Sequence, residues 1–267
     1  MNTKNIVRIL LSLVLVFGFS SAWAAQTIKW SMQGDSLTLD PHAQNEGPTT
    51  QVSRQVYEAL VQRGLDMKIG PALATSWKAT DPNTWVFQLR KDAKFSDGSG
   101  MTSADVVFSI LRAKQRTSDF KEYISTVSNV EAAGDYAVKI TTSKPNPILL
   151  NQLSNIFIMS KAWSEKNFAM SPQNWDAGQE TFSATNALGT GPFKITLREP
   201  NTKTVFKRNK HWWGEMDDSG LTKIELLPIK NAATRVAALL SGEIDLVTDA
   251  PVQDLKRIGS SSGHKVE

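Results

Sequence analysis

The pattern of apolar and polar positions is clearest in a stretch near residue 100. Apolar side chains occupy every second position from Trp85 to Leu89, which is the period of a strand with one buried face. A Ser-Asp-Gly turn follows. Thr102 and Asp105 then have the spacing of a capping box, and apolar residues continue at helical spacing as far as Leu111. The stretch predicts a strand, a tight loop and a capped helix, which is a unit of an α/β fold.

The same two periods recur along most of the chain. The chain has no internal repeat and no low-complexity linker. The spacing of apolar residues shows only weak periodicity over residues 160–182, and at 148–153 it does not distinguish a helix from a strand. Thr49 or Thr50 is expected to cap the first helix and Asn231 a later one. Further strands are predicted at 26–33, 136–142, 193–198, 204–209 and 224–227, and a last helix from Pro251 to Ile258.

The N-terminus has the pattern of a secretory signal peptide. Lys4 and Arg8 form a basic region, residues 9–19 are almost entirely apolar, and Ala22-Trp23-Ala24 is a typical cleavage site. The apolar run is shorter than the roughly 20 residues needed to span a bilayer. We therefore expect residues 1–24 to be cleaved and the mature chain to have no stable membrane insertion.

Composition narrows the class of protein. The 267 residues are 40% hydrophobic and 21% charged, which are values of a folded globular protein. The net charge is +4, and Lys4 and Arg8 supply two of these charges, which leaves +2 for the rest of the chain and argues against a nucleic-acid partner. Cysteine is absent, so neither disulfides nor a lipoprotein anchor is available. These features predict a soluble protein of the periplasm.

Several motifs resemble one family. The aromatic strand ending in Leu-Arg-Lys-Asp, the Asp-Gly turn and Thr-x-x-Asp-Val-Val-Phe, over residues 85–108, are similar to the signature of the bacterial extracellular solute-binding proteins of family 5. These are the oligopeptide-, dipeptide- and nickel-binding components of ABC importers. Other segments resemble the family in the same order, namely Leu-Asp-Pro-His at 39–42, Tyr-Glu-x-Leu at 57–60, Pro-x-Leu-Ala-x-Ser-Trp at 71–77, Gly-Thr-Gly-Pro-Phe at 189–193, Arg-Asn-x-x-Trp-Trp at 208–213 with Trp212 in place of Tyr, and Gly-Glu-Ile-Asp-Leu at 242–246.

The resemblance implies a periplasmic-binding-protein-like α/β fold with mixed sheets and flanking helices. It implies a first-lobe core made of residues 25–65 and 186–267, with a subdomain inserted at 66–185. Family members are typically much longer and have two lobes, so we expect this chain to correspond to the N-terminal portion, with the second lobe missing.

The function implied by the resemblance is capture of a peptide-like solute and its delivery to an ABC permease in the inner membrane, without catalysis. Such proteins close two lobes around the ligand, so we expect this chain alone to bind peptide weakly or not at all. Two alternatives stay open: an exported hydrolase or sensor built on the same lobe, and a fragment without independent function.

Five residues are candidate ligand contacts. Asn45, Glu46 and Gly47 precede a predicted helix N-terminus, where free N–H groups favour polar ligands, and by resemblance they face the cleft. Phe120 and Tyr123 resemble the position at which family members place an aromatic ring over the ligand. A solvated loop and ordinary core packing are the respective alternatives.

Neither catalytic nor metal chemistry emerges from the sequence. The histidines, His42, His211 and His264, lack metal-ligand spacing, and there is no Gly-x-Ser-x-Gly elbow. The Gly-Thr-Gly segment at 189–191 is a poor phosphate cradle because Pro192 offers no N–H, and we expect it to form a crossover near the hinge. We therefore predict no catalytic residue, no metal and no cofactor.

Overall fold

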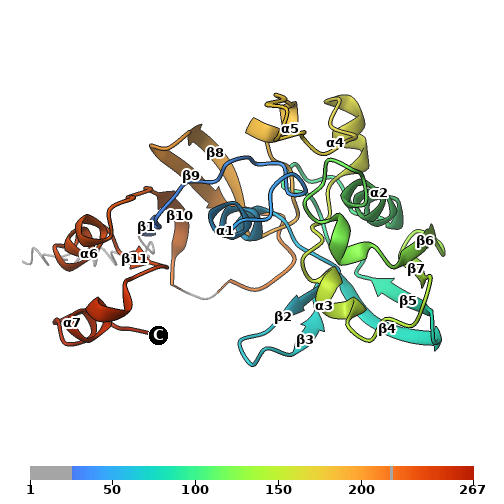
Figure 1. The fold of residues 1–267 in the computed structure, drawn as a ribbon, viewed down its shortest axis with the longest axis horizontal. Coiled ribbons are helices and arrows are strands. Elements are labelled where there is room, and N and C mark those ends of the chain that lie inside the picture. The colour runs from blue at the N-terminus through green and yellow to red at the C-terminus, as the bar shows by residue number, and fades with distance from the viewer. Residues whose placement is uncertain (1–25, 217–218) are drawn as a thin grey trace, which may run out of the picture.

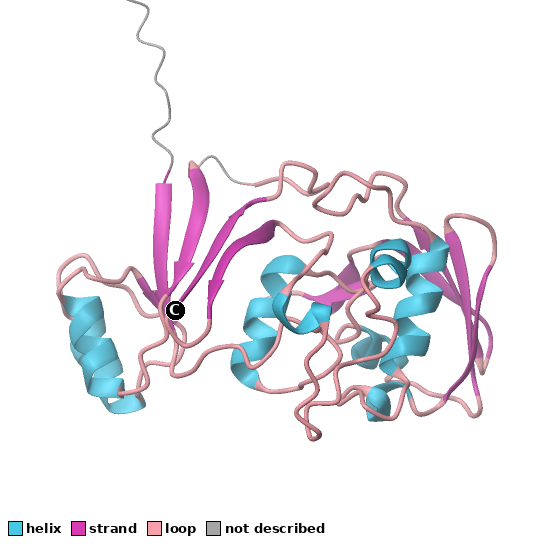
Figure 2. Ribbon diagram, turned by 90° about the horizontal axis from the view of Figure 1, so that it is seen from above, coloured by secondary structure: helices cyan, strands magenta, loops and turns pink. Residues whose placement is uncertain are grey.

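Two separate sheets with helices between them form the molecule. The computed structural model describes residues 26–216 and 219–267, and the signal peptide predicted for residues 1–24 lies outside this part. Figures 1 and 2 show the second sheet at one end of the elongated body and the first sheet towards the other, with α1 (Gly47–Val56) between them and α6 (Ala232–Leu240) and α7 (Leu255–Gly259) beyond the first sheet. No helix in the described part is long and apolar enough to cross a membrane.

The first sheet combines the start and the end of the chain. Its order is β11-β1-β10-β9-β8, in which β1 runs parallel to β10 and β11 while β8, β9 and β10 are antiparallel. Trp30 pairs with Leu226, and both side chains are buried. The strands are β1 (Gln26–Ser31), β8 (Phe193–Glu199), β9 (Lys203–Arg208), β10 (Leu221–Leu226) and β11 (Leu246–Val247).

The second sheet is antiparallel and belongs to the middle of the chain. Its order is β4-β5-β7-β6, and the strand predicted from Trp85 is confirmed, with Phe87 buried and Gln88 exposed. The strands are β4 (Ala74–Asp81), β5 (Thr84–Leu89), β6 (Val127–Ala132) and β7 (Ala137–Thr142). A separate hairpin, β2 (Val61–Arg63) and β3 (Ile69–Pro71), straddles the predicted boundary at residue 65. The exact domain limits therefore stay a prediction.

Local side-chain bonds set the helix starts. The predicted capping box is confirmed, since the Thr102 N–H donates to Asp105 Oδ2 over 2.8 Å, and Asn231 caps α6 as expected. The first helix begins at Gly47, before the expected Thr49 or Thr50, because the Glu46 carboxylate accepts from the Thr49 N–H. The helices after α1 are α2 (Ser103–Ala113), α3 (Leu149–Leu153), α4 (Lys161–Lys166), α5 (Phe182–Thr185), α6 (Ala232–Leu240) and α7 (Leu255–Gly259), with 3-10 turns η1 (Lys121–Ile124) and η2 (Val252–Asp254).

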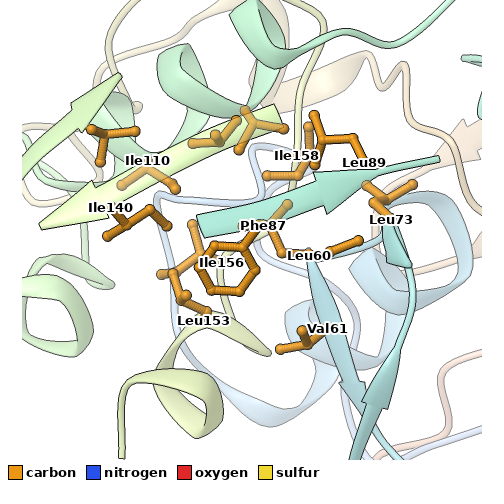
Figure 3. Close-up of a cluster of buried hydrophobic side chains, with 14 of the residues drawn as sticks. Leu60, Val61, Leu73, Phe87, Leu89, Ile110, Ile140, Leu153, Ile156 and Ile158 are labelled. Atoms are coloured by element: carbon orange, nitrogen blue, oxygen red, sulfur yellow. The ribbon is translucent and has the colours of Figure 1, made fainter. Parts of the chain in front are cut away.

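Apolar burial stabilises each sheet and joins the two. The larger cluster lies under the second sheet and brings Phe87 against side chains of α2, β2 and α3 (Figure 3). The other main cluster combines the first sheet and α1 with Phe108 of α2 and with Phe157. Because this second cluster draws on both parts of the chain, the two sheets are packed into one body.

A buried ion pair ties the Leu-Asp-Pro-His segment to α2. Both Asp40 oxygens accept from the Arg112 guanidinium, at 2.7 and 2.6 Å, and both side chains are excluded from solvent. Ser183 Oγ and the Gln173 N–H also donate to Asp40. Burial by itself opposes ionisation of Asp40, but Arg112 and these donors outweigh it and lower its pKa to about 2. The motif therefore has a structural role, and His42 beside it is buried in the same cluster.

The Gly-Thr-Gly segment packs against the end of α1. The Gly191 N–H donates to the Val56 carbonyl oxygen over 2.8 Å. A Cβ on Gly189 would lie 2.0 Å from that oxygen, and one on Gly191 would lie 2.7 Å from the Val56 carbonyl carbon. Only glycine allows this close approach, which joins the strand β8 to the first helix.

Candidate ligand-binding face

Two of the five predicted residues meet at the N-terminal end of α1. Asn45 Nδ2 donates to the Tyr123 hydroxyl over 3.3 Å, and both side chains reach solvent. Gly47 is exposed and opens the helix next to them. Asn45 lies in the loop before α1 and Tyr123 in η1, so a long-range contact of 78 residues in sequence brings them together.

The other two predicted residues have supporting roles in this arrangement. The Glu46 carboxylate accepts from the Thr49 N–H over 2.7 Å, so it caps α1. Phe120 is only 2% exposed, with its ring centroid 5.9 Å from that of Tyr123 and 6.3 Å from that of His42. Phe120 thus packs beneath Tyr123 and fixes the position of the more exposed ring.

A groove of about 460 Å³ extends from Tyr123 towards β2. Its most strongly charged groups are Arg54, in the last turn of α1, and Arg63, at the end of β2. Asn155 Oδ1 accepts from Arg54 over 3.3 Å, and Asn151 Oδ1 accepts from Arg63 over 3.0 Å. The complete lining is Arg54, Arg63, Tyr123, Ile148, Asn151, Gln152, Ser154 and Asn155.

A second hollow of about 260 Å³ continues on the other side of the two arginines and contains Glu58. The Glu58 oxygens accept from the indole N–H groups of Trp212, at 3.1 Å, and Trp213, at 3.0 Å. Burial raises the pKa of Glu58, and the indole bonds and the nearby Arg90 only partly offset it. The Trp pair after β9 therefore holds a carboxylate and packs at the strand end.

An apolar hollow of about 360 Å³ adjoins these two on the face of the first sheet. Arg54 lines it as well, so this guanidinium lies where three hollows meet. The apolar part of the lining consists of Ile28, Trp30, Phe193, Leu221, Ile224 and Leu246. The whole face thus offers amide donors and acceptors, a phenol, two cations and an apolar surface, which suits a ligand with both polar and apolar groups.

The chemistry of this face favours binding over reaction. No nucleophile with an adjacent base lines the groove around Arg54 and Tyr123. His42 is fully buried and hydrogen-bonded to the Phe157 carbonyl, so it is unable to act on a bound molecule. Among the described residues, no three His, Asp or Glu side chains gather in a way that could hold a metal ion.

Sequence reasoning missed the two arginines and their amide partners. Asn151 lies in α3, and Asn155, four residues further on, follows the end of that helix and donates from its side chain to the Asn151 carbonyl oxygen over 3.0 Å. That spacing was the available signal, whereas nothing in the chain sequence relates Arg54 to Arg63. Their proximity follows from the way β2 returns past the end of α1.

Sequence similarity to known proteins extends along nearly the whole chain. The periplasmic murein peptide-binding protein MppA of Escherichia coli K12 is 26% identical over an alignment of 278 positions, which covers 93% of this chain and 50% of that protein. This chain therefore spans about half the length of this curated relative.

Solved structures agree with the fold. The binding protein AgaA from A. tumefaciens R10, in complex with agropinic acid, superposes with a TM-score of 0.79 at 27% identity, covering 89% of this chain and 46% of that one. DppA from Helicobacter pylori, in complex with the peptide STSA, has a TM-score of 0.75 at 25% identity, covering 87% of this chain and 48% of that one. The predicted periplasmic-binding-protein-like α/β fold is confirmed.

The family model matches three quarters of the chain. It describes the bacterial extracellular solute-binding proteins, family 5 middle region, and it covers residues 68–267. The proteins of this family bind solutes and are not enzymes. Its match includes the second sheet, the groove residues on α3 and the returning strands of the first sheet. The chain therefore belongs to the bacterial extracellular solute-binding proteins of family 5.

Proposed function

We propose that this chain takes part in the capture of a peptide-like solute in the periplasm and its delivery to an ABC permease of the inner membrane. The observation that carries the proposal is the match to peptide-binding relatives along nearly the whole chain. The groove between α1, η1 and α3 supports it, since its polar groups are the amides, hydroxyls and cations that recognise peptide groups.

The proposed contacts divide into two kinds. Tyr123 lines the groove, and Asn45 and Gly47 lie exposed beside it at the start of α1, so we expect these three to touch the solute directly. Glu46 and Phe120 hold these three in place, the first by capping α1 and the second by packing under Tyr123. A Tyr123→Ala variant should therefore weaken solute binding, while Phe120→Ala should weaken both binding and folding.

The open groove limits how tightly this chain alone can bind. High affinity in such sites comes from burying most of the ligand between two lobes, which removes water from its polar contacts. A solute lying in the groove described here keeps much of its hydration. We therefore expect dissociation constants weaker than micromolar for the chain tested alone.

Isothermal titration of the mature chain with a mixture of tripeptides tests this proposal. We expect small, saturable heats that disappear in Tyr123→Ala, with the peptides recovered intact by mass spectrometry. Sub-micromolar binding would show that one half suffices, and peptide cleavage that survives further purification would identify a hydrolase instead. N-terminal sequencing of the exported protein tests the cellular location, and we expect cleavage after Ala24.

A further inference from the structure

Two arginines on the groove have no carboxylate partner among the residues that the structure describes. Five other arginines in the described part of the chain form ion pairs with an Asp, and these are Arg90, Arg112, Arg198, Arg235 and Arg257. Arg54 and Arg63 instead contact the neutral side-chain amides of Asn155 and Asn151. The acid that lines the neighbouring hollow, Glu58, is held by the two indole N–H groups.

The surroundings keep these two cations close together. Both side chains line the same two hollows, so their charges face a shared space. Burial and repulsion from Arg63 lower the pKa of Arg54, and the Arg54 guanidinium also lies 5.9 Å from the centroid of the Phe157 ring. Two positive charges held close together repel each other, and an anion bound between them would relieve this repulsion.

We propose that Arg54 and Arg63 bind a carboxylate group of the solute. This inference rests on the proposed function and names the chemical class of its ligand, an acidic peptide or a related organic acid. Each guanidinium can donate two parallel N–H bonds to a planar carboxylate. The single bonds to Asn151 and Asn155 orient the guanidinium groups and leave their other donors available.

The shape of the site favours a small acid as the occupant. The groove of about 460 Å³ lies within the range of small-molecule sites, and neutral amides and the Tyr123 hydroxyl line it beside the arginines. Neutral hydrogen-bonding groups of this kind suit the rest of a peptide-like molecule. Additional cations would be expected around a multiply charged phosphate.

Titration with glutarate and with its uncharged diamide tests the assignment on the mature chain. At low ionic strength we expect glutarate to bind, with an affinity that falls as NaCl is added, and the diamide not to bind. Arg54→Gln and Arg63→Gln should each weaken glutarate binding about tenfold or more, which is the effect of losing a charge-assisted hydrogen bond. Arg208→Gln, an exposed arginine on β9, is the matched control and should bind as the wild type does.

Several results would overturn the assignment. These are an absence of glutarate binding, equal binding of the diamide, wild-type affinity in both groove variants, and tighter binding of inorganic phosphate than of glutarate. Thermal unfolding of each variant checks that the fold is intact, and Arg54→Lys, which keeps the charge without the planar fork, should fall between wild type and Arg54→Gln.

The peptide titration separates this inference from the proposed function. If acidic peptides bind equally well to wild type and to both groove variants, the carboxylate site is wrong and solute capture stands. If glutarate binding depends on the arginines but no peptide in the mixture binds, the carboxylate site stands and capture of peptides does not.

Discussion

The buried imidazole of His42 should make the stability of this protein strongly dependent on pH. Its Nε2 lies 2.9 Å from the Phe157 carbonyl oxygen and its Nδ1 lies 3.2 Å from Arg112 Nη1. A carbonyl only accepts and a guanidinium only donates, so Nε2 carries the proton and Nδ1 is the acceptor. Protonation of Nδ1 would remove this acceptor and place a positive charge against Arg112.

The magnitude follows from proton linkage. Burial, together with the charge of Arg112, lowers the pKa of His42 from 6.5 to about 3, although Asp40 and the Phe157 carbonyl favour the cation. Between these two pH values the unfolded state binds one proton more than the native state, so the free energy of unfolding rises with pH. The slope approaches about 1.4 kcal/mol per pH unit, and the loss from pH 7 to pH 4.5 amounts to roughly 2–3 kcal/mol.

Urea unfolding followed by tryptophan fluorescence at four pH values between 7 and 4.5 measures this loss. The lowered pKa of Asp40 makes its ion pair a stabilising contribution that is present above pH 3.8 and lost as pH falls towards 2, so it changes little over this range. His42→Gln is the comparison, because its amide can donate to Phe157 and accept from Arg112 without titrating. Glu58, whose pKa is raised by burial, is the same in wild type and variant, so the difference between the two proteins reports the imidazole. Wild type should lose roughly 2–3 kcal/mol more than the variant over the range. Parallel pH profiles would refute the assigned protonation state.

Three further substitutions test the packing, each by urea unfolding at neutral pH. Arg112→Met leaves the Asp40 charge buried without its partner and should lower the free energy of unfolding by about 3–5 kcal/mol. A variant as stable as wild type would show that water reaches the Asp40 carboxylate. Gly189→Ala places a methyl against the Val56 carbonyl and should cost about 1–3 kcal/mol or more, whereas Gly100→Ala, with open space around it, should cost little. Phe87→Ala removes a fully buried ring and should cost about 3–5 kcal/mol, and a loss below 1 kcal/mol would mean that the cluster collapses around the gap.

Strands with one apolar face were predictable, and strands without one were not. In β5, Phe87 and Leu89 are buried and Gln88 between them is exposed, and the strand was found from the alternation of apolar residues. Its neighbour β4 is exposed along most of its length, so no alternation of apolar residues marks it, and its pairing with β5 defines it. Helix starts were predictable where the cap is a short polar residue, as at Asn231, and misplaced at Gly47, where the Glu46 side chain acts instead.

The amino-acid sequence by itself determined the main strands and helices, because periodicity, capping and turn chemistry act between residues a few positions apart. The family and its fold class came from the resemblance of the ordered motifs to family 5. Only the tertiary structure decided which polar side chains meet. Asp40 pairs with Arg112 across 72 residues, and Asn45 meets Tyr123 across 78. The shared groove of Arg54 and Arg63 likewise depends on α3 lying beside both. Charge and hydrogen-bond contacts act through space over a few ångströms, so their partners are set by the packing of the two sheets.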